Sequence, residues 1–260
     1  MSSVQRQIRL LPGWLGSLQG RRLLAADLRE VRAAMAGIFG DEFLQIGNWG
    51  DNSFVRSART RRARVLADTL IPGVDIVSEL EQLAIASDSI DAVLLAHTLD
   101  IHCNPHAVLR EVDRILRPDG HLLVLGFNPG GPWGLRRLLS RGTFPPGIQH
   151  MISEHRLKDW LRLLSFRTRK AEFYHYQQPF FRIWADSGAE SRMNNTAASV
   201  RSASSGRQRL GRRLAWPVFA ACYVVVARKE TYQATLVRPS WRNRRRLVGG
   251  LVNPTTRNVA

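Results

Sequence analysis

The sequence predicts an α/β fold built around a parallel sheet, and three consecutive segments between residues 91 and 127 carry that prediction. Residues 91–96 (DAVLLA) form a short apolar run, typical of a strand that is buried on both faces of a sheet. Residues 105–116 carry apolar side chains at helical spacing, and residues 121–127 (HLLVLGF) form a second buried strand. Strand, helix and strand in this order make a parallel crossover unit.

The ends of the predicted helix are marked by residues that start or stop helices. Pro105 fits the first helical position, and Asn104 before it fits the cap. The helix is expected to stop at residues 117–120 (RPDG), because proline cannot continue it and Gly120 readily takes the positive φ of a turn. The apolar stripe between these ends consists of Val108, Leu109, Val112, Ile115 and Leu116.

Upstream, residues 42–51 (EFLQIGNWGD) are the candidate first strand and ligand loop. Residues 43–46 supply the strand, and Gly47 and Gly50 supply the turn at its carboxyl end. Glycines at this place let the backbone approach a ligand closely, in the crevice where open α/β sheets bind their ligands.

Further elements follow from the same kinds of signal. Residues 53–63 (SFVRSARTRRA) are expected to form the first helix and residues 64–67 (RVLA) the second strand, with Asp68 at its end. The later elements are a short helix at residues 133–140, a loop at 141–149, a helix at 153–164 capped by Ser153, a strand at 168–176 and a final strand at 218–228.

Composition divides the chain into a core and its extensions. Large apolar residues are scarce in the stretch before the final strand, which is rich in Ser, Ala, Asn and Arg, so it is expected to be a flexible insertion. The expected parts are an N-terminal helical extension that caps the pocket (1–40), the core (41–186), the flexible insertion (187–213), the final strand of the core (214–230) and a basic disordered tail (231–260).

Two motifs carry a resemblance to a known family. Residues 88–93 (DSIDAV) and 114–120 (RILRPDG), with a histidine loop between them, resemble the central signature of class I S-adenosylmethionine-dependent methyltransferases, specifically the type 11 group. Over residues 40–186 the chain is similar to uncharacterised proteobacterial proteins that carry this domain. The resemblance implies a Rossmann-like, seven-stranded sheet with helices on both faces. It also implies S-adenosyl-L-methionine as cofactor and methyl transfer to an N, O, C or S atom.

The resemblance assigns roles around the glycine loop. Gln45 stands where the family has a carboxylate that helps hold the ammonium group of the cofactor, so hydrogen bonding is kept and charge attraction is lost. Gly47, Asn48 and Gly50 are implied to lie at the methionine end of the cofactor. Trp49 stands at the central glycine position of the family pattern and is expected to crowd the loop.

The resemblance also assigns roles beyond this loop. In the family a carboxylate after the second strand accepts hydrogen bonds from both ribose hydroxyls. Asp68 and Asp75 are both candidates, because residues 73–78 (GVDIVS) also resemble the family's second strand. No residue is identified as catalytic. The positions that match the adenine contacts and the pocket wall are Glu79, Leu80 and His97.

Composition excludes several classes of protein. The chain has 260 residues, of which 44% are hydrophobic, enough for one substantial core. Cys103 and Cys222 lie far apart, so neither a disulfide framework nor a metal site is expected. No run approaches the length of a membrane helix and no secretory signal is evident, so the cytoplasm is the expected location.

The charge leaves the methyl acceptor open. The chain carries 38 basic and 21 acidic residues, for a formal net charge of +17, and nearly all of the basic residues are arginine. Such an excess is typical of polyanionic partners, but a coding bias toward arginine produces it too. The acceptor is therefore a small molecule or RNA, and the oligomeric state stays open. An alternative function is a catalytically degenerate methyltransferase-fold protein that acts as a ligand-sensing or RNA-binding module.

Overall fold

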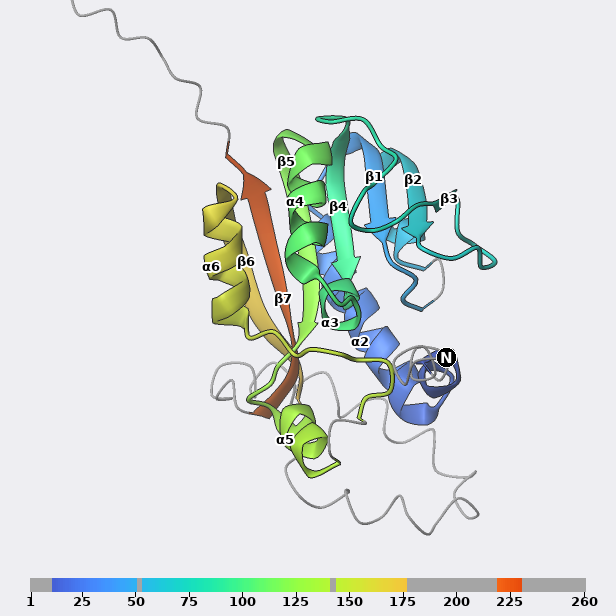
Figure 1. Cartoon of the computed structure of the whole chain (residues 1–260), viewed down its shortest axis with the longest axis vertical. Coiled ribbons are helices and arrows are strands. Elements are labelled where there is room, and N and C mark those ends of the chain that lie inside the picture. Colours follow the sequence, from blue (N-terminus) through green and yellow to red (C-terminus); the bar gives the residue numbers. More distant parts are fainter. Residues whose placement is uncertain (1–10, 51–52, 141–143, 177–218, 231–260) are drawn as a thin grey trace, which may run out of the picture.

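The computed structural model describes residues 11–50, 53–140, 144–176 and 219–230. Within them, seven strands form one sheet in the order β3-β2-β1-β4-β5-β7-β6 (Figure 1). The strands are β1 (Gly40–Ile46), β2 (Thr60–Ala67), β3 (Ile76–Val77), β4 (Ile90–Ala96), β5 (Leu116–Phe127), β6 (Phe166–Tyr176) and β7 (Ala220–Lys229).

The strand directions are those of a Rossmann-like sheet with one antiparallel strand. β1 pairs in parallel with β2 and β4, and β4 pairs in parallel with β5. β7 lies between β5 and β6 and runs antiparallel to both. The parallel strands therefore end together at one side of the sheet, the carboxyl edge, and begin together at the opposite side, the amino edge.

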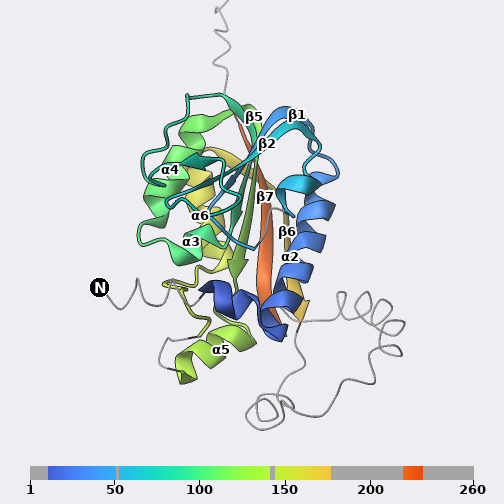
Figure 2. The ribbon, with the colours of Figure 1, turned by 90° about the vertical axis from the view of Figure 1, so that its right-hand side faces the viewer.

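Helices cover both faces of the sheet, which confirms the predicted fold class. The long helix α2 (Leu18–Met35) lies across one face, whereas α4 (Pro105–Ile115) and α6 (Glu154–Leu163) lie on the other (Figures 1 and 2). Because side chains alternate along a strand, Phe43 packs into the core on the α2 side and Leu44 into the core on the α4 side. The two short helices, α3 (Thr98–Ile101) and α5 (Pro132–Leu139), follow β4 and β5 at the carboxyl edge.

The predicted first helix at residues 53–63 is wrong. The chain makes only a 3-10 turn, η1 (Val55–Ser57), and β2 already begins at Thr60, which pairs with Gly40 of β1. The segment has no apolar stripe at helical spacing, so a helix there would have had little to bury against the sheet. Pairing with β1 satisfies the backbone of this arginine-rich stretch instead.

The turn before the second predicted strand also differs from expectation. Asp119, not Gly120, takes the positive φ, at 66°. Gly120 is needed for space, since a Cβ there would lie 2.8 Å from the carbonyl oxygen of Arg117. β5 starts at Leu116, before this turn, and its register with β4 shifts between Ile90 and Ala92.

The later helices and strands agree with the predicted bounds to within two residues, but the predicted cap at Asn104 is wrong. Asn104 precedes α4 but its side chain makes no capping hydrogen bond, whereas Ser153 Oγ caps α6 by accepting from the backbone N–H of Arg156 at 3.4 Å. The expected insertion (187–213) and tail (231–260) lie outside the described residues. In the part of the chain that the structure describes, no helix has the length and apolar character needed to cross a membrane.

Candidate functional site

The glycine loop leaves β1 at the carboxyl edge, in strained backbone conformations that glycine tolerates. Gly47 has φ 91° and Gly50 has φ 75°. A Cβ on Gly47 would lie 2.6 Å from Thr98 Oγ1, and that hydroxyl donates a hydrogen bond to the carbonyl of Ile46 at 2.5 Å. Gly47 is therefore required by the packing of α3 against β1, before any ligand is considered.

Trp49 turns into the protein instead of lining the loop. Its side chain is 1% exposed, and its indole N–H donates to Asp27 Oδ2 of α2 at 2.9 Å. The centroid of the indole ring lies 4.4 Å from the centroid of the His97 ring and 6.0 Å from that of the Phe127 ring. The position that is glycine in the family pattern thus contributes the side chain that ties the loop to α2.

Asp27 is the centre of a buried polar cluster on the α2 side of the sheet. Its Oδ1 accepts a hydrogen bond from the hydroxyl of Tyr174 in β6 at 2.7 Å, and its Oδ2 lies 3.6 Å from His97 Nε2. On the other side of the ring, His97 Nδ1 lies 3.4 Å from Asp100 Oδ2. We call Asp27, Trp49, His97, Asp100 and Tyr174 the carboxyl-edge cluster. All five are buried.

The two carboxylates determine the charge of His97. Burial by itself lowers the pKa of His97, but the hydrogen bonds and negative charges of Asp100 and Asp27 outweigh it and raise the pKa to about 9. Burial raises the pKa of Asp100. His97 opposes this rise, and so do the backbone N–H groups of Phe127 and Ile152, which donate hydrogen bonds to the Asp100 carboxylate. His97 is consequently an imidazolium at neutral pH, which can donate a proton but cannot accept one.

Gln45 offers an unused acceptor next to the loop. The side chain is 2% exposed, and its Nε2 donates to the carbonyl of Gly47 at 3.2 Å. Its Oε1 is buried and has no hydrogen-bond partner within the described residues. Because a buried unpaired acceptor is unfavourable, this oxygen is suited to receive a donor from a bound molecule.

The structure separates the two ribose candidates. Asp68 directly follows β2 at the carboxyl edge, is exposed, and accepts a hydrogen bond from Thr69 Oγ1 at 3.2 Å. Asp75 lies beside Val65, short of that edge, and its carboxylate accepts the backbone N–H of Val65 at 2.8 Å. The strand beside β1 is therefore β2 (Thr60–Ala67) and not residues 73–78, and Asp68 is the carboxylate that follows it.

The remaining predicted residues differ in exposure. Glu79 and Leu80 follow β3 at the carboxyl edge; Glu79 is exposed, whereas Leu80 is buried in the core on the α4 side. Asn48 is exposed in the loop. His97 lies at the end of β4, in the left-handed region at φ 55°. No group of three or more His, Cys, Asp or Glu in the described ranges is placed to hold a metal ion.

Sequence reasoning missed three members of the carboxyl-edge cluster, namely Asp27, Asp100 and Tyr174. One signal was available, because Asp27 lies between Leu23 and Val31 on the apolar side of α2, where a charge is unusual. Nothing local marks Tyr174 as its partner, since the two residues are 147 positions apart.

A cavity of about 310 Å³ lies far from this site, at the amino edge. It is lined by residues that begin β1, β4 and β5, including Glu42, Ile90 and Arg117. It lies at the opposite end of the strands from the glycine loop and belongs to no predicted site.

Comparisons with known proteins agree with this architecture. A family model described as a methyltransferase domain, Methyltransf_11, matches residues 51–124. The uncharacterized protein YafS of Escherichia coli (strain K12) is 34% identical over 168 residues, which are 63% of this chain and 69% of that protein. The uncharacterized protein Rv2003c of Mycobacterium tuberculosis is 30% identical over 154 residues, 57% of this chain and 53% of that protein.

Two solved structures share the fold at low sequence identity. A SAM-dependent methyltransferase from Archaeoglobus fulgidus superposes with a TM-score of 0.54 at 17% identity, covering 80% of this chain and 94% of that one. The N-methyltransferase NodS of Bradyrhizobium japonicum, in complex with S-adenosyl-L-homocysteine, gives a TM-score of 0.51 at 11% identity, covering 88% and 97%.

Proposed function

This chain belongs to the class I S-adenosylmethionine-dependent methyltransferases, and from that membership we propose that it binds S-adenosyl-L-methionine at the carboxyl edge and transfers its methyl group. S-adenosyl-L-methionine is the cofactor of this family. The observation that carries the proposal is the pair of positive-φ glycines, Gly47 and Gly50, at the carboxyl end of β1 in a sheet of this strand order.

The predicted site residues give the bound cofactor an orientation. Its methionine end lies over Gly47, Asn48 and Gly50, and Gln45 Oε1 accepts a hydrogen bond from the ammonium group. Asp68 receives the ribose hydroxyls, since a carboxylate suits two adjacent donors. The adenine lies beside Glu79 and Leu80, and His97 closes the inner wall of the pocket. The unpaired Oε1 of Gln45 supports the first of these contacts.

The chain's own contribution to the reaction is positioning and charge. The cofactor supplies an already activated methyl group, so holding the acceptor in line with it accounts for most of the required rate enhancement. His97 is protonated and buried, so it orients the wall of the pocket and does not remove a proton from the acceptor. The carboxyl groups of Asp27 and Asp100 flank His97 at 3.6 and 3.4 Å, and acidic groups here suit a cationic sulfonium nearby. The acceptor is a small molecule or RNA.

One observation favours the second candidate, a degenerate methyltransferase fold that senses a ligand or binds RNA. The buried indole of Trp49 stands where the family pattern has a glycine, and it is held by Asp27 and packed on His97. Cofactor that enters the loop has to coexist with this indole or displace it. Weak binding is the expected consequence.

Calorimetric titration of the full chain with S-adenosyl-L-methionine and S-adenosyl-L-homocysteine tests the proposal. We expect saturable heat for both compounds in the wild type, and stronger binding in Gln45→Glu, because a carboxylate restores attraction for the ammonium group by about 1 kcal/mol. Binding that appears only in Trp49→Ala identifies the degenerate fold. Absence of heat at millimolar concentration in the wild type and in both folded variants refutes cofactor binding.

A further inference from the structure

Helix α5 presents leucine side chains to solvent at the carboxyl edge (Figure 1). Leu135, Leu138 and Leu139 are 48%, 77% and 76% exposed. Their spacing of three and four positions puts them on one face of the helix, and we call these three residues the leucine face. Single apolar side chains on a protein surface are common, but no other helix of the described residues exposes more than one large apolar side chain.

Other side chains of α5 already hold the helix in place. Trp133 is buried and stacks on Phe127 of β5, with 5.6 Å between the ring centroids. The Arg136 guanidinium lies 3.9 Å from the centroid of the Phe144 ring. Arg137 donates hydrogen bonds to two backbone carbonyls of the following loop at 2.8 and 2.9 Å. The leucine face makes none of these contacts, so the packing of α5 does not explain why leucines occupy it.

The two segments that meet at α5 have no acidic residues. Residues 11–26 and 129–153 contain no Asp or Glu, although the whole chain has 21 acidic residues. The segments are in contact, because the ring centroids of Trp14 and Trp133 are 5.7 Å apart. The surface that they form therefore carries positive charge only.

Four arginines supply this positive charge. Arg136 Nη1 donates to Gln19 Oε1 at 3.5 Å, which joins α5 to the first turns of α2 (Figure 2). Arg21 and Arg22 lie in these turns and are exposed. In the part of the chain that the structure describes, neither these two residues nor Arg136 and Arg137 form an ion pair with a carboxylate. Their charge is therefore not neutralised locally.

Exposed leucines beside unpaired arginines match the interface of an anionic lipid bilayer. Leucine side chains enter the acyl region there, while arginine side chains reach the negative headgroups. A nucleic acid offers phosphates to the arginines but no aliphatic region to the leucines. A second copy of the chain docked on the same face would bring the four arginines of each copy together, and like charges repel. A lipid surface satisfies the leucines and the arginines at once.

We propose that the leucine face and the arginines beside it dock the chain on an anionic membrane surface. The leucines lie below the headgroups, and Arg21, Arg22, Arg136 and Arg137 lie among them. Three leucines bury little apolar surface, so the binding is peripheral and reversible. Because α5 follows β5 at the carboxyl edge, docking turns that edge toward the lipid. This inference is independent of the proposed methyl transfer, since it requires no bound cofactor.

Co-sedimentation of the full chain with vesicles of equal parts phosphatidylserine and phosphatidylcholine tests the proposal, with pure phosphatidylcholine vesicles in parallel. The apolar variant is Leu138→Ser. Its matched control is Leu163→Ser, which removes an equally exposed leucine from the end of α6, at the amino edge.

The charge variant carries Arg21→Gln and Arg22→Gln. Its matched control carries Arg61→Gln and Arg162→Gln, which remove two exposed arginines from the amino edge. Melting temperatures show whether each variant is folded.

We expect the wild type to bind the phosphatidylserine vesicles more strongly than the pure phosphatidylcholine vesicles. Leu138→Ser is expected to lower the partition coefficient about tenfold, because one leucine no longer leaves water. The charge variant is expected to lower it about thirtyfold on phosphatidylserine and much less on pure phosphatidylcholine, since the attraction requires anionic lipid. Both matched controls are expected to bind as the wild type does, because their sites lie beyond the reach of the surface potential.

Four results would overturn the inference. The first is a wild type that does not sediment with phosphatidylserine vesicles. The second is an equal loss of binding in a variant and its matched control, which would show that the location of the residues does not matter. A fall in melting temperature in Leu138→Ser but not in Leu163→Ser would show that the leucine face packs against the chain itself. A dimer in light scattering that Leu138→Ser dissociates would show that a second copy covers it.

Discussion

The two edges of the sheet hold charged side chains in opposite ways. At the carboxyl edge, Asp27, His97 and Asp100 are buried and contact one another across α2, β4 and α3. At the amino edge, Arg61 and Arg62 of β2 lie in water and pair with Asp41 and Glu42 at 3.7 and 2.8 Å. A buried charge is stable only with its partner, whereas an exposed one is nearly neutral for folding. The carboxyl-edge cluster therefore contributes to the stability of the fold, whereas the exposed ion pairs at the amino edge contribute little to it.

The largest expected effect comes from removing one partner of the carboxyl-edge cluster. Asp27→Ala leaves the imidazolium of His97 with one carboxylate and the indole and phenol donors of Trp49 and Tyr174 without their acceptor. We expect a loss of about 3–5 kcal/mol in the free energy of unfolding, measured by urea denaturation. Asp41→Ala at the amino edge removes an exposed carboxylate and is expected to change it by less than about 0.5 kcal/mol. Equal losses of unfolding free energy in Asp27→Ala and Asp41→Ala would contradict the difference between the two edges.

The next effect is a pH dependence that the buried His97 of the carboxyl edge provides. The pKa of His97 is raised from 6.5 to about 9 in the folded protein, so folding favours its protonated form. The resulting stability, about 3 kcal/mol, is fully present below pH 6.5, declines as pH rises, and is lost above about pH 9. Urea denaturation at pH 6.5 and pH 8.5 measures most of it, below the pH at which the buried Cys222 thiol, whose pKa is also raised, adds a decline of its own.

A substitution at His97 serves as the control for this dependence. His97→Gln is expected to remove most of the decline between pH 6.5 and 9, because glutamine does not titrate. His155→Gln, on an exposed histidine of α6, is expected to leave the decline in place. A decline that persists unchanged in His97→Gln would assign it to another group.

The smallest effect concerns backbone conformation. Gly47→Ala is expected to cost about 2 kcal/mol, because φ 91° is unfavourable for alanine and the new Cβ would meet Thr98 Oγ1 at 2.6 Å. Gly37→Ala, between α2 and β1, places its Cβ where no atom lies within 4 Å and is expected to be neutral or slightly stabilising. Thermal melting of both variants gives the comparison. A neutral Gly47→Ala would leave ligand approach as the reason for glycine at this position.

The sequence by itself determined the central unit of the fold. β4, α4 and β5 were predictable because each depends on signals within a few residues of itself, namely an apolar run, a proline with a helical stripe, and the RPDG turn. Even there, the sequence did not show that Asp119 takes the positive φ, or that Gly120 is needed because a Cβ would lie 2.8 Å from the carbonyl oxygen of Arg117. The glycine loop and its place at the end of β1 were also readable from sequence.

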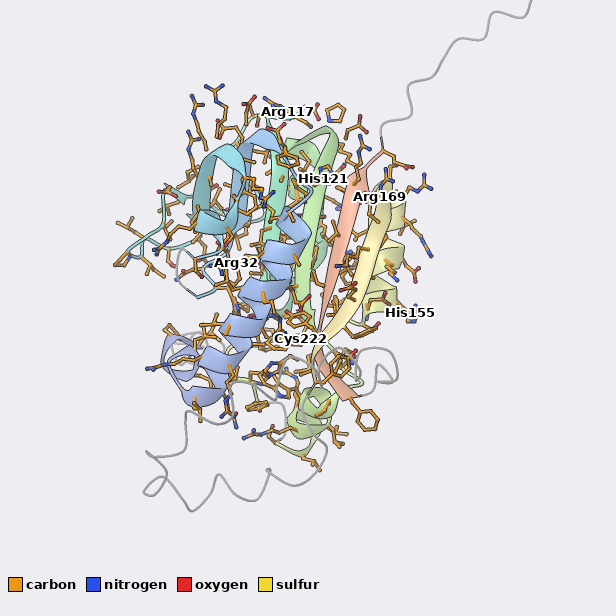
Figure 3. All side chains as sticks on the ribbon, turned by 180° about the vertical axis from the view of Figure 1, so that it is seen from behind. Arg32, Arg117, His121, His155, Arg169 and Cys222 are labelled. Atoms are coloured by element: carbon orange, nitrogen blue, oxygen red, sulfur yellow. The ribbon has the colours of Figure 1, made fainter. Side chains whose placement is uncertain are left out.

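The tertiary structure alone decided which charged groups surround His97 and that residues 60–64 form the first half of β2. Asp27 reaches His97, Trp49 and Tyr174 only because α2 crosses the face of the sheet (Figure 3), and whether a carboxylate is buried depends on what packs against it. The arginine-rich residues 60–64 became a strand because β1 offered them backbone partners, although their side chains have no core to enter. Local patterns record which side chains prefer to be buried, but pairing between distant segments determines which ones are.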